Sequence, residues 1–292
     1  MIEITLKLIL FFLISLLYFY SSIGYGKILA NNKSNFFDLY IDGTIILLIV
    51  GYFLYISIGI NHLFNIIIIL AGLILFFFYK TKIIVIKFKY ISLLLFLIFT
   101  ILIISKTHED FNNYHYFSIY EIYNNRLRIG ISNLNSYFIH SSHLILNQGL
   151  TILPYLNFKI IHLPVFFIYF STIGYFILIL FNNNSKNDEI FFSIIFLLIL
   201  LIKFNRLSEI GYDYIAQYIL LIVFHKIYFL NFDYQEQVKA ITYFILCVLI
   251  KPISLLFFPI LLYVLYKHGF SFYKKISIKK YFLYFLLIVT LF

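Results

Sequence analysis

Long apolar segments alternate with short polar ones along most of the chain, and this pattern predicts membrane-spanning helices. A helix needs about 20 apolar residues to cross a bilayer. On this criterion we expect spans at 4–23, 44–61, 63–79, 90–105, 163–181, 190–204 and 213–230, then an apolar block at 239–267 and a last segment from 281. The last segment reaches only Phe292, so we expect the chain to be a fragment or a shortened relative of a longer protein.

A proline interrupts the apolar block 239–267. Pro252 lacks a backbone donor and disfavours helical geometry at the residue before it, Lys251. A single helix would place Lys251 near the centre of the bilayer, where a charge is costly. We therefore predict two short helices, 239–250 and 253–267, that meet in a turn at the outer surface.

The composition agrees with a membrane protein and excludes a soluble globular domain. The mean hydropathy is +0.99, and 63% of the residues are hydrophobic while only 12% are charged. The expected fold class is all-α, a polytopic transmembrane helical bundle with about eight to ten membrane segments. We expect one integral membrane domain over 1–292 in a bacterial inner (plasma) membrane. The single cysteine, Cys247, excludes an intrachain disulfide and a cysteine-based metal site.

The lysines predict the orientation of the chain. Cytoplasmic loops of membrane proteins carry an excess of Lys and Arg, and one short loop is rich in lysine: Lys80, Lys82, Lys87 and Lys89. With that loop in the cytoplasm, four spans occupy 4–105, the loop 106–162 is extracytoplasmic, and the remaining spans follow over 163–292. The net charge of +10 is explained by such loops and does not indicate a nucleic-acid partner.

The loop 106–162 is too long for a simple connection, and two series of its residues fall at helical spacing. Examples are Phe111, Tyr114, Ser118 and Ile122, and then Leu134, Phe138, Ser141 and Ile145. This periodicity predicts two amphipathic helices that lie on the outer membrane surface.

The most polar stretch of the chain begins this loop. Two adjacent carboxylates, Glu109 and Asp110, stand beside histidines that include His115. Ionisable residues at the edge of a membrane often mark chemistry or transport. An alternative is that Asp110 only caps the first amphipathic helix, but this leaves Glu109 and His115 unexplained.

Further ionisable residues fall on the same predicted side. Arginine binds phosphate oxygens in bidentate fashion, so arginines outside the cytoplasm suggest an anionic ligand, although each could instead pair with a nearby carboxylate. Glu209, Asp213 and Gln217 are spaced to share one helix face, either as part of a site or as a structural polar seam. The candidate binding residues are His115, Arg126, Arg128, Arg206, Glu209, Asp213 and Lys251.

Histidines concentrate in the loop 106–162, which holds five of the eight in the chain. His140 and His143 are three residues apart and could share a divalent metal with a carboxylate, although such a pair is more often solvated. We therefore assign no metal site and no cofactor from the sequence, and a divalent metal stays an alternative.

Taken together, these motifs resemble a family of uncharacterised bacterial membrane proteins related to the GT-C glycosyltransferases. The resemblance covers roughly residues 90–267 and rests on four elements: Glu109-Asp110 with Tyr114-His115, Gly130-x-x-Asn133-Leu134-Asn135 with Ser141-Ser142, Glu209-x-Gly211-x-Asp213-x-x-x-Gln217, and Lys251-x-x-Ser254. It implies a GT-C-like fold and transfer of a sugar from a polyprenyl-phosphate donor at the extracytoplasmic face, in cell-envelope glycan synthesis.

The chemistry of such a transfer suggests roles for the polar residues. Inverting transfer needs a carboxylate base for the acceptor hydroxyl, and cations that offset the charge on the departing phosphate. We expect Asp110 to be the base and Glu109 its helper. The expected partners are the bilayer, the polyprenyl-phosphate donor and an acceptor glycan or lipid. The alternatives are a polysaccharide polymerase or lipid-linked oligosaccharide flippase, and a non-catalytic membrane protein.

Overall fold

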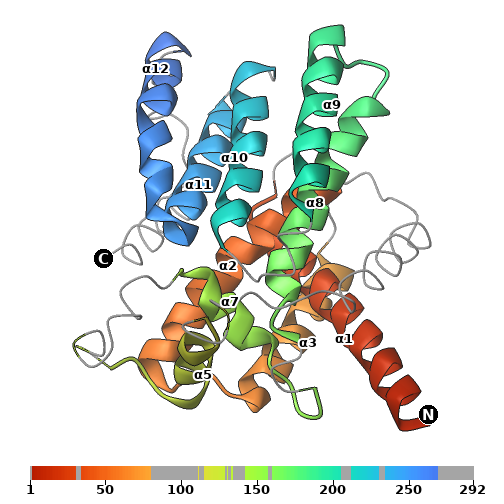
Figure 1. Cartoon of the computed structure of the whole chain (residues 1–292), viewed down its shortest axis with the longest axis vertical. Helices are drawn as coiled ribbons and strands as arrows, with labels where there is room; N and C mark the ends of the chain where they lie inside the picture. Colours follow the sequence, from red (N-terminus) through yellow and green to blue (C-terminus); the bar gives the residue numbers. More distant parts are fainter. Residues whose placement is uncertain are drawn as a thin grey trace. The chain divides into compact units, whose positions relative to one another are not determined.

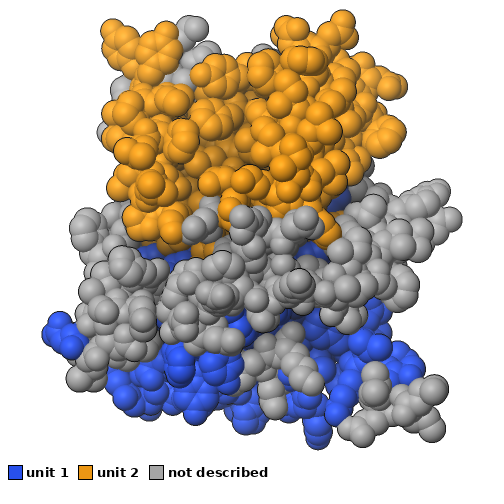
Figure 2. Space-filling view, viewed as in Figure 1, with its two compact units in different colours: residues 1–167, 205–211 blue, residues 168–204, 212–292 orange. Residues whose placement is uncertain are grey.

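The computed structural model describes residues 2–30, 34–79, 111, 115–128, 130, 133, 142–156, 160–204, 212–229 and 234–268. This part of the chain is helical and contains no β-strand. The chain divides into two compact units (Figure 2): unit 1 comprises residues 1–167 and 205–211, and unit 2 comprises residues 168–204 and 212–292.

Three helices are long and apolar enough to cross a membrane: Thr5–Gly26 within α1 (Ile2–Gly26), α2 (Phe36–Ser57) and α8 (Leu163–Leu180). Shorter apolar helices include α3 (His62–Phe78) and most of α10 (Asp213–Tyr228). The helices expected near 4–23, 63–79, 163–181 and 213–230 are therefore confirmed as helices. The segments expected at 90–105 and from 281 lie outside the described residues.

Helix α2 begins eight residues earlier than the apolar run predicted. The predicted span started at residue 44, after the polar residues, whereas α2 starts at Phe36. Asn35 caps the helix: its side chain accepts from the Asp38 N–H at 2.8 Å, and the Asp38 carboxylate accepts from the Asn35 N–H at 3.3 Å. This reciprocal capping box fixes the helix start. Asp38 and Asp42 are consequently buried within the first two turns.

Glycines allow the first three helices of unit 1 to approach at backbone distance. A Cβ added at Gly24 of α1 would lie 1.9 Å from the carbonyl oxygen of Gly72 on α3. A Cβ at Gly43 of α2 would lie 1.8 Å from the carbonyl oxygen of Ser22 on α1. Small residues at helix crossings are typical of membrane bundles, where close backbone packing drives association. Figure 1 shows these helices together in the lower half of the view.

Two short helices of the loop 106–162 are described, α5 (Tyr116–Asn124) and α7 (Leu144–Thr151). The first predicted amphipathic helix is confirmed as a helix by α5. Most of the second predicted helix lies outside the described residues, and α7, which follows it, has all of its residues buried. The α7 segment therefore does not lie on a surface as an amphipathic helix would, because it packs against α2, α3 and α5.

Amide side chains hold α7 in this buried position. Asn65 of α3 donates from Nδ2 to the carbonyl oxygens of Gly149, at 2.9 Å, and Ile152, at 2.8 Å. Asn147 of α7 donates from Nδ2 to the carbonyl oxygen of Thr44 on α2, at 3.0 Å. Backbone carbonyls at the end of α7 are thereby satisfied away from water, which burial requires.

Unit 2 contains most of α8, from Ile168 onward, and the helices α9 (Asn187–Ile202), α10, α11 (Tyr234–Ile250) and α12 (Phe258–His268), with a 3₁₀ turn at Pro252–Phe257. Figure 1 shows α10, α11 and α12 side by side. The chain leaves the helix at Lys251, which is extended with φ −146° and ψ 107°. The ring of Phe244 on α11 stacks on that of Phe258 on α12 at 6.2 Å. The predicted helix break at Lys251-Pro252 is confirmed, and the position of this turn relative to a membrane stays a prediction.

Candidate functional site

The described part of the predicted site lies at the end of α5. Glu109, Asp110, Arg206 and Glu209 are outside the described residues. Asp213 is the first residue of α10, and its side chain is also outside the described part. His115 precedes α5 and is buried, whereas Arg126 and Arg128 follow the other end of this helix and are exposed. Lys251 belongs to unit 2. Among the members of the predicted set that the structure describes, Arg126 and Arg128 lie on the same short segment after α5.

A pocket of about 400 Å³ opens where the end of α5 meets the loop between α2 and α3. One wall is formed by the α2–α3 loop and the start of α3, and the other by the last residues of α5 and the segment after it. The lining residues are Ile58, Gly59, Ile60, Asn61, His62, Tyr123, Asn124, Asn125 and Arg126. This volume lies within the usual range for small-ligand sites.

Local sequence explains the shape of this pocket. Gly59 has φ +89°, the left-handed conformation that only glycine adopts at low cost, and its N–H donates to the Leu54 carbonyl at 2.7 Å. This ends α2 and turns the chain toward α3. The N–H of Leu127 donates to the carbonyl oxygen of Tyr55 at 3.0 Å. That bond fixes the end of α5 beside the end of α2, with Arg126 on the pocket wall.

The pocket wall is positively charged. The N-terminus of α3 carries the positive end of the helix dipole, and Asn61 caps it by accepting from the N–H groups of Leu63, at 3.0 Å, and Phe64, at 3.1 Å. Arg126 adds a full positive charge. Within the residues that the structure describes, no ion pair of Arg126 is found. An anion at this site would meet the Arg126 guanidinium and the positive end of the α3 dipole, while the N–H groups of Leu63 and Phe64 stay bonded to Asn61.

Arg128 is held differently. Its Nε lies 3.7 Å from Oε1 of Glu121, and its Nη2 donates to Oδ1 of Asn125. Asn125 in turn donates from Nδ2 to Oε2 of Glu121 at 2.8 Å. For Arg128, the predicted alternative of pairing with a nearby carboxylate is therefore what the structure shows.

Two histidines of the loop 106–162 pack on aromatic rings in unit 1. His143 lies 5.4 Å from the ring of Tyr52, and His162 stacks on Phe111 at 6.3 Å. Burial lowers the pKa of each imidazole from 6.5 to about 4, so both rings are neutral at pH 7. His140 lies outside the described residues, so the predicted metal alternative for His140 and His143 stays untested. No group of three metal-binding side chains occurs in the described ranges.

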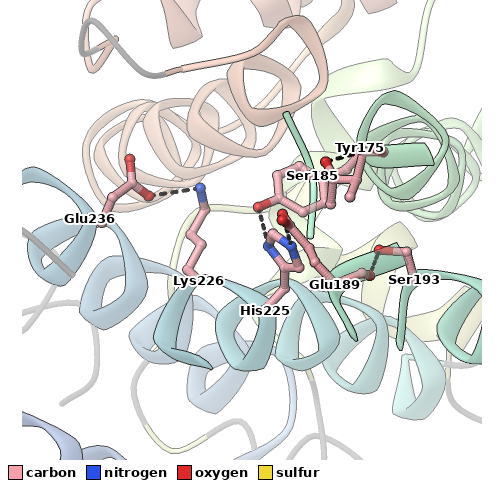
Figure 3. Close-up of polar contacts among 8 residues, drawn as sticks. Tyr175, Ser185, Glu189, Ser193, His225, Lys226 and Glu236 are labelled. Carbon is pink, nitrogen blue, oxygen red and sulfur yellow. Dashed lines mark hydrogen bonds and ion pairs between the residues drawn. The ribbon is translucent and has the colours of Figure 1, made fainter. Parts of the chain in front are cut away.

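A second polar cluster, which we call the unit 2 cluster, was not predicted (Figure 3). Its members are Tyr175, Glu189, His225, Lys226 and Glu236. His225 Nε2 lies 2.9 Å from Glu189 Oε1, and the Tyr175 hydroxyl lies 2.9 Å from His225 Nδ1. Lys226 Nζ lies 3.1 Å from Glu236 Oε2. Buried ionisable groups in an apolar helical protein indicate function more often than stability alone.

Sequence signals for the missed residues existed but were weak. His225 and Lys226 are adjacent in the last turn of α10, after an apolar run. Glu189 and Glu236 each lie in a first helical turn, where acids commonly serve only the helix dipole. Asp38 and Asp42 are four residues apart at the start of α2, and both are buried. No spacing rule pairs residues that lie on different helices, so only the fold could bring them together.

Comparison with known proteins adds no further identification. No protein-family model, curated protein or solved structure matches this chain.

Proposed function

We propose that this chain is a multi-pass membrane glycosyltransferase of GT-C type. In this proposal it takes a sugar from a polyprenyl-phosphate donor at the extracytoplasmic face of a bacterial inner membrane and transfers it during cell-envelope glycan synthesis. The observation that carries the proposal is the pocket lined by Arg126 in unit 1, which has room and charge for a phosphate headgroup.

The chemistry of a lipid-linked donor suits this pocket. The leaving group of the transfer is a phosphate, whose charge increases as the glycosidic bond breaks, and preorganised cations stabilise that charge. Arg126 offers a planar guanidinium that can bind two phosphate oxygens at once. Helix α2, which is long and apolar enough to cross a membrane, ends at this pocket. A polyprenyl chain could therefore lie along apolar helix surface while its phosphate reaches Arg126.

The predicted orientation agrees with this placement. The lysine-rich loop 80–89 places the end of the second span, near residue 61, on the extracytoplasmic side. The loop 106–162, which contains α5, is predicted to lie on the same side. These two segments form the two walls of the pocket. Segments that are far apart in the sequence but share a predicted side of the membrane thus contribute to one site.

The residue roles follow from this arrangement. Asp110 is the proposed base that removes the acceptor proton, and Glu109 assists it. Arg126 binds the donor phosphate, and Arg128, tied to Glu121 and Asn125, positions the Arg126 segment. Roles for His115, Arg206, Glu209, Asp213 and Lys251 in substrate binding stay part of the proposal.

A transfer assay tests the proposal. The full-length chain in proteoliposomes is supplied with polyprenyl-phosphate sugars, and sugar incorporation into outer-face acceptors is measured. Asp110→Asn removes the base but keeps the shape of the side chain, so it should lower turnover by about a hundred- to ten-thousand-fold. Arg126→Ala should raise the KM for the donor more than it lowers kcat. Transfer by Asp110→Asn at the wild-type rate would remove Asp110 from the mechanism.

The unit 2 cluster favours a second candidate, a lipid-linked oligosaccharide flippase or a polysaccharide polymerase. Transport proteins place paired ionisable side chains inside apolar helical bundles, as Lys226 and Glu236 are placed here. A flippase would move a labelled lipid-linked oligosaccharide across the vesicle membrane without forming a new glycosidic bond. A polymerase would extend such an oligosaccharide instead, so one product analysis separates the candidates.

A further inference from the structure

The unit 2 cluster gathers at one end of its helical bundle. Tyr175 lies near the end of α8, Glu189 in the first turn of α9, His225 in the last turn of α10 and Glu236 in the first turn of α11. Because consecutive helices run in opposite directions, these four helix ends meet at one level. Figure 3 shows the side chains converging from separate helices.

Three of these side chains form a continuous hydrogen-bonded line. His225 has two chemically distinct ring nitrogens: the Tyr175 hydroxyl lies 2.9 Å from Nδ1, and the Glu189 carboxylate lies 2.9 Å from Nε2. An ionised carboxylate can only accept a hydrogen bond. The neutral ring therefore donates from Nε2 to Glu189 and accepts at Nδ1 from the Tyr175 hydroxyl. Nδ1 is then the atom that can take up a further proton.

One end of this line reaches water and the other does not. The Glu189 side chain is 13% exposed, whereas that of His225 is 1% exposed. The α8–α9 loop beside Glu189 is polar and exposed at Asn182, Asn183, Asn184 and Lys186. Burial raises the pKa of Glu189 above its usual value, and the charge of Lys186 opposes this rise. Water therefore reaches this line of side chains at its Glu189 end.

The charged side chains near His225 are compatible with one added proton on its ring. Lys226 on α10 pairs with Glu236 on α11, and its ammonium also lies 5.2 Å from the centre of the Tyr175 ring. Lys239 on α11 faces the ring of Tyr243 at 5.8 Å. The Lys226–Glu236 pair is neutral as a unit. A proton on His225 would be balanced by the Glu189 carboxylate, although burial opposes any charge here.

We propose that Glu189, His225 and Tyr175 form a proton-binding site that is loaded when Nδ1 of His225 takes up a proton, with the Glu189 carboxylate at Nε2 balancing the added charge. On loading, Nδ1 gains the proton and donates to the Tyr175 oxygen, and the phenolic hydrogen turns away; no covalent bond other than the new N–H bond is formed. The imidazolium then attracts the Glu189 carboxylate, so the loaded site holds α9 on α10 more firmly than the neutral one. This site uses unit 2 residues only and does not depend on the proposed transferase activity.

Nuclear magnetic resonance of the full chain in detergent, with ¹⁵N-labelled histidine, tests the proposal directly. The His225 signal is assigned by its loss in His225→Gln, and its titration is followed from about pH 4 to 9. We expect one titration step for His225. Glu189→Gln removes the balancing charge and should move the midpoint at least one unit lower, which is a tenfold weaker proton affinity. Asp188→Asn is the matched control, because this exposed neighbour carries the same charge in the same turn.

Two results would overturn the site. One is a wild-type His225 signal that does not titrate over this range, and the other is a Glu189→Gln midpoint equal to that of Asp188→Asn. Glu189→Asp keeps the charge and shortens the side chain, so it provides a second test if the glutamine variant does not fold. It should move the midpoint in the same direction but by less, and an unchanged midpoint there would also count against the site.

Discussion

The two units join their helices with different kinds of polar contact. In unit 1, Asn65, Asn147 and Tyr25 donate to backbone carbonyls of neighbouring helices, and glycines let the backbones approach. In unit 2, His225 and Lys226 bond to carboxylates on other helices. A carbonyl does not titrate, whereas a carboxylate and an imidazole do. Among these contacts of the described residues, those of unit 1 depend on shape and on neutral donors, whereas those of unit 2 also depend on charge.

The largest effect should follow from removing one charge of the buried pair in unit 2. Lys226→Met leaves the Glu236 carboxylate buried without its lysine, which typically costs about 3–5 kcal/mol. The double variant Lys226→Met with Glu236→Leu should recover most of this loss, because both charges are then gone. Unfolding of the purified chain in detergent measures the free energies. Lys186→Met, at an exposed lysine, is the control, and a single variant as stable as that control would contradict the role of charge.

The matching test in unit 1 changes shape and no charge. Gly24→Ala places a methyl group 1.9 Å from the Gly72 carbonyl oxygen, so α1 and α3 must move apart. Overpacking of this kind costs about 1–3 kcal/mol, or more when backbone must shift. Gly149→Ala is the matched control, since its nearest atom, Cγ2 of Ile122, would lie at 3.5 Å. Equal unfolding midpoints for the two variants would show that close approach of α1 and α3 is unimportant.

A smaller effect on stability is expected in unit 1 when the pH is lowered. The pKa of His143 is about 4 in the folded chain, compared with 6.5 without burial. Between these values the unfolded chain binds more protons, so the stability contribution of neutral His143 is complete above pH 6.5 and is lost as pH falls toward 4. The loss is at most about 3 kcal/mol.

His143→Gln should therefore flatten the fall in stability between pH 6.5 and 4, as measured by unfolding in detergent at several pH values. His62→Gln, which replaces an exposed histidine, should keep the slope of the wild type. Parallel slopes for wild type and His143→Gln would contradict the burial of a neutral ring at this position.

The helices of both units could largely be predicted from the sequence, because apolar runs and proline act locally. The helix break at Lys251-Pro252 is the clearest case, since proline removes a donor whatever surrounds it. The start of α2 could not be placed by the same rule, because a capping box at Asn35 and Asp38 extends the helix over polar residues. Hydropathy treats Asp38 and Asp42 as loop residues, whereas the fold buries them.

The candidate site was predicted less well, for a physical reason. Arg126 could be identified because an arginine on the predicted outer side is unexpected. Its pocket also depends on Gly59 and Asn61, which are distant in sequence and contribute through backbone geometry rather than charge. In unit 2, the partners of His225 come from α8 and α9, and only tertiary packing selects them among the tyrosines and acids of the chain.

The central claim is that the pocket in unit 1 binds the phosphate of a polyprenyl-phosphate lipid. Binding of polyprenyl phosphate and of the uncharged polyprenol to the full chain in nanodiscs tests this directly. The wild type should bind the phosphate more tightly than the polyprenol. Arg126→Ala should weaken phosphate binding by about ten- to a hundredfold, and Arg126→Lys should weaken it by less. The control variant Lys186→Ala should keep the wild-type affinity. Equal affinity for the phosphate in Arg126→Ala and wild type, or equal binding of phosphate and polyprenol, would contradict the account.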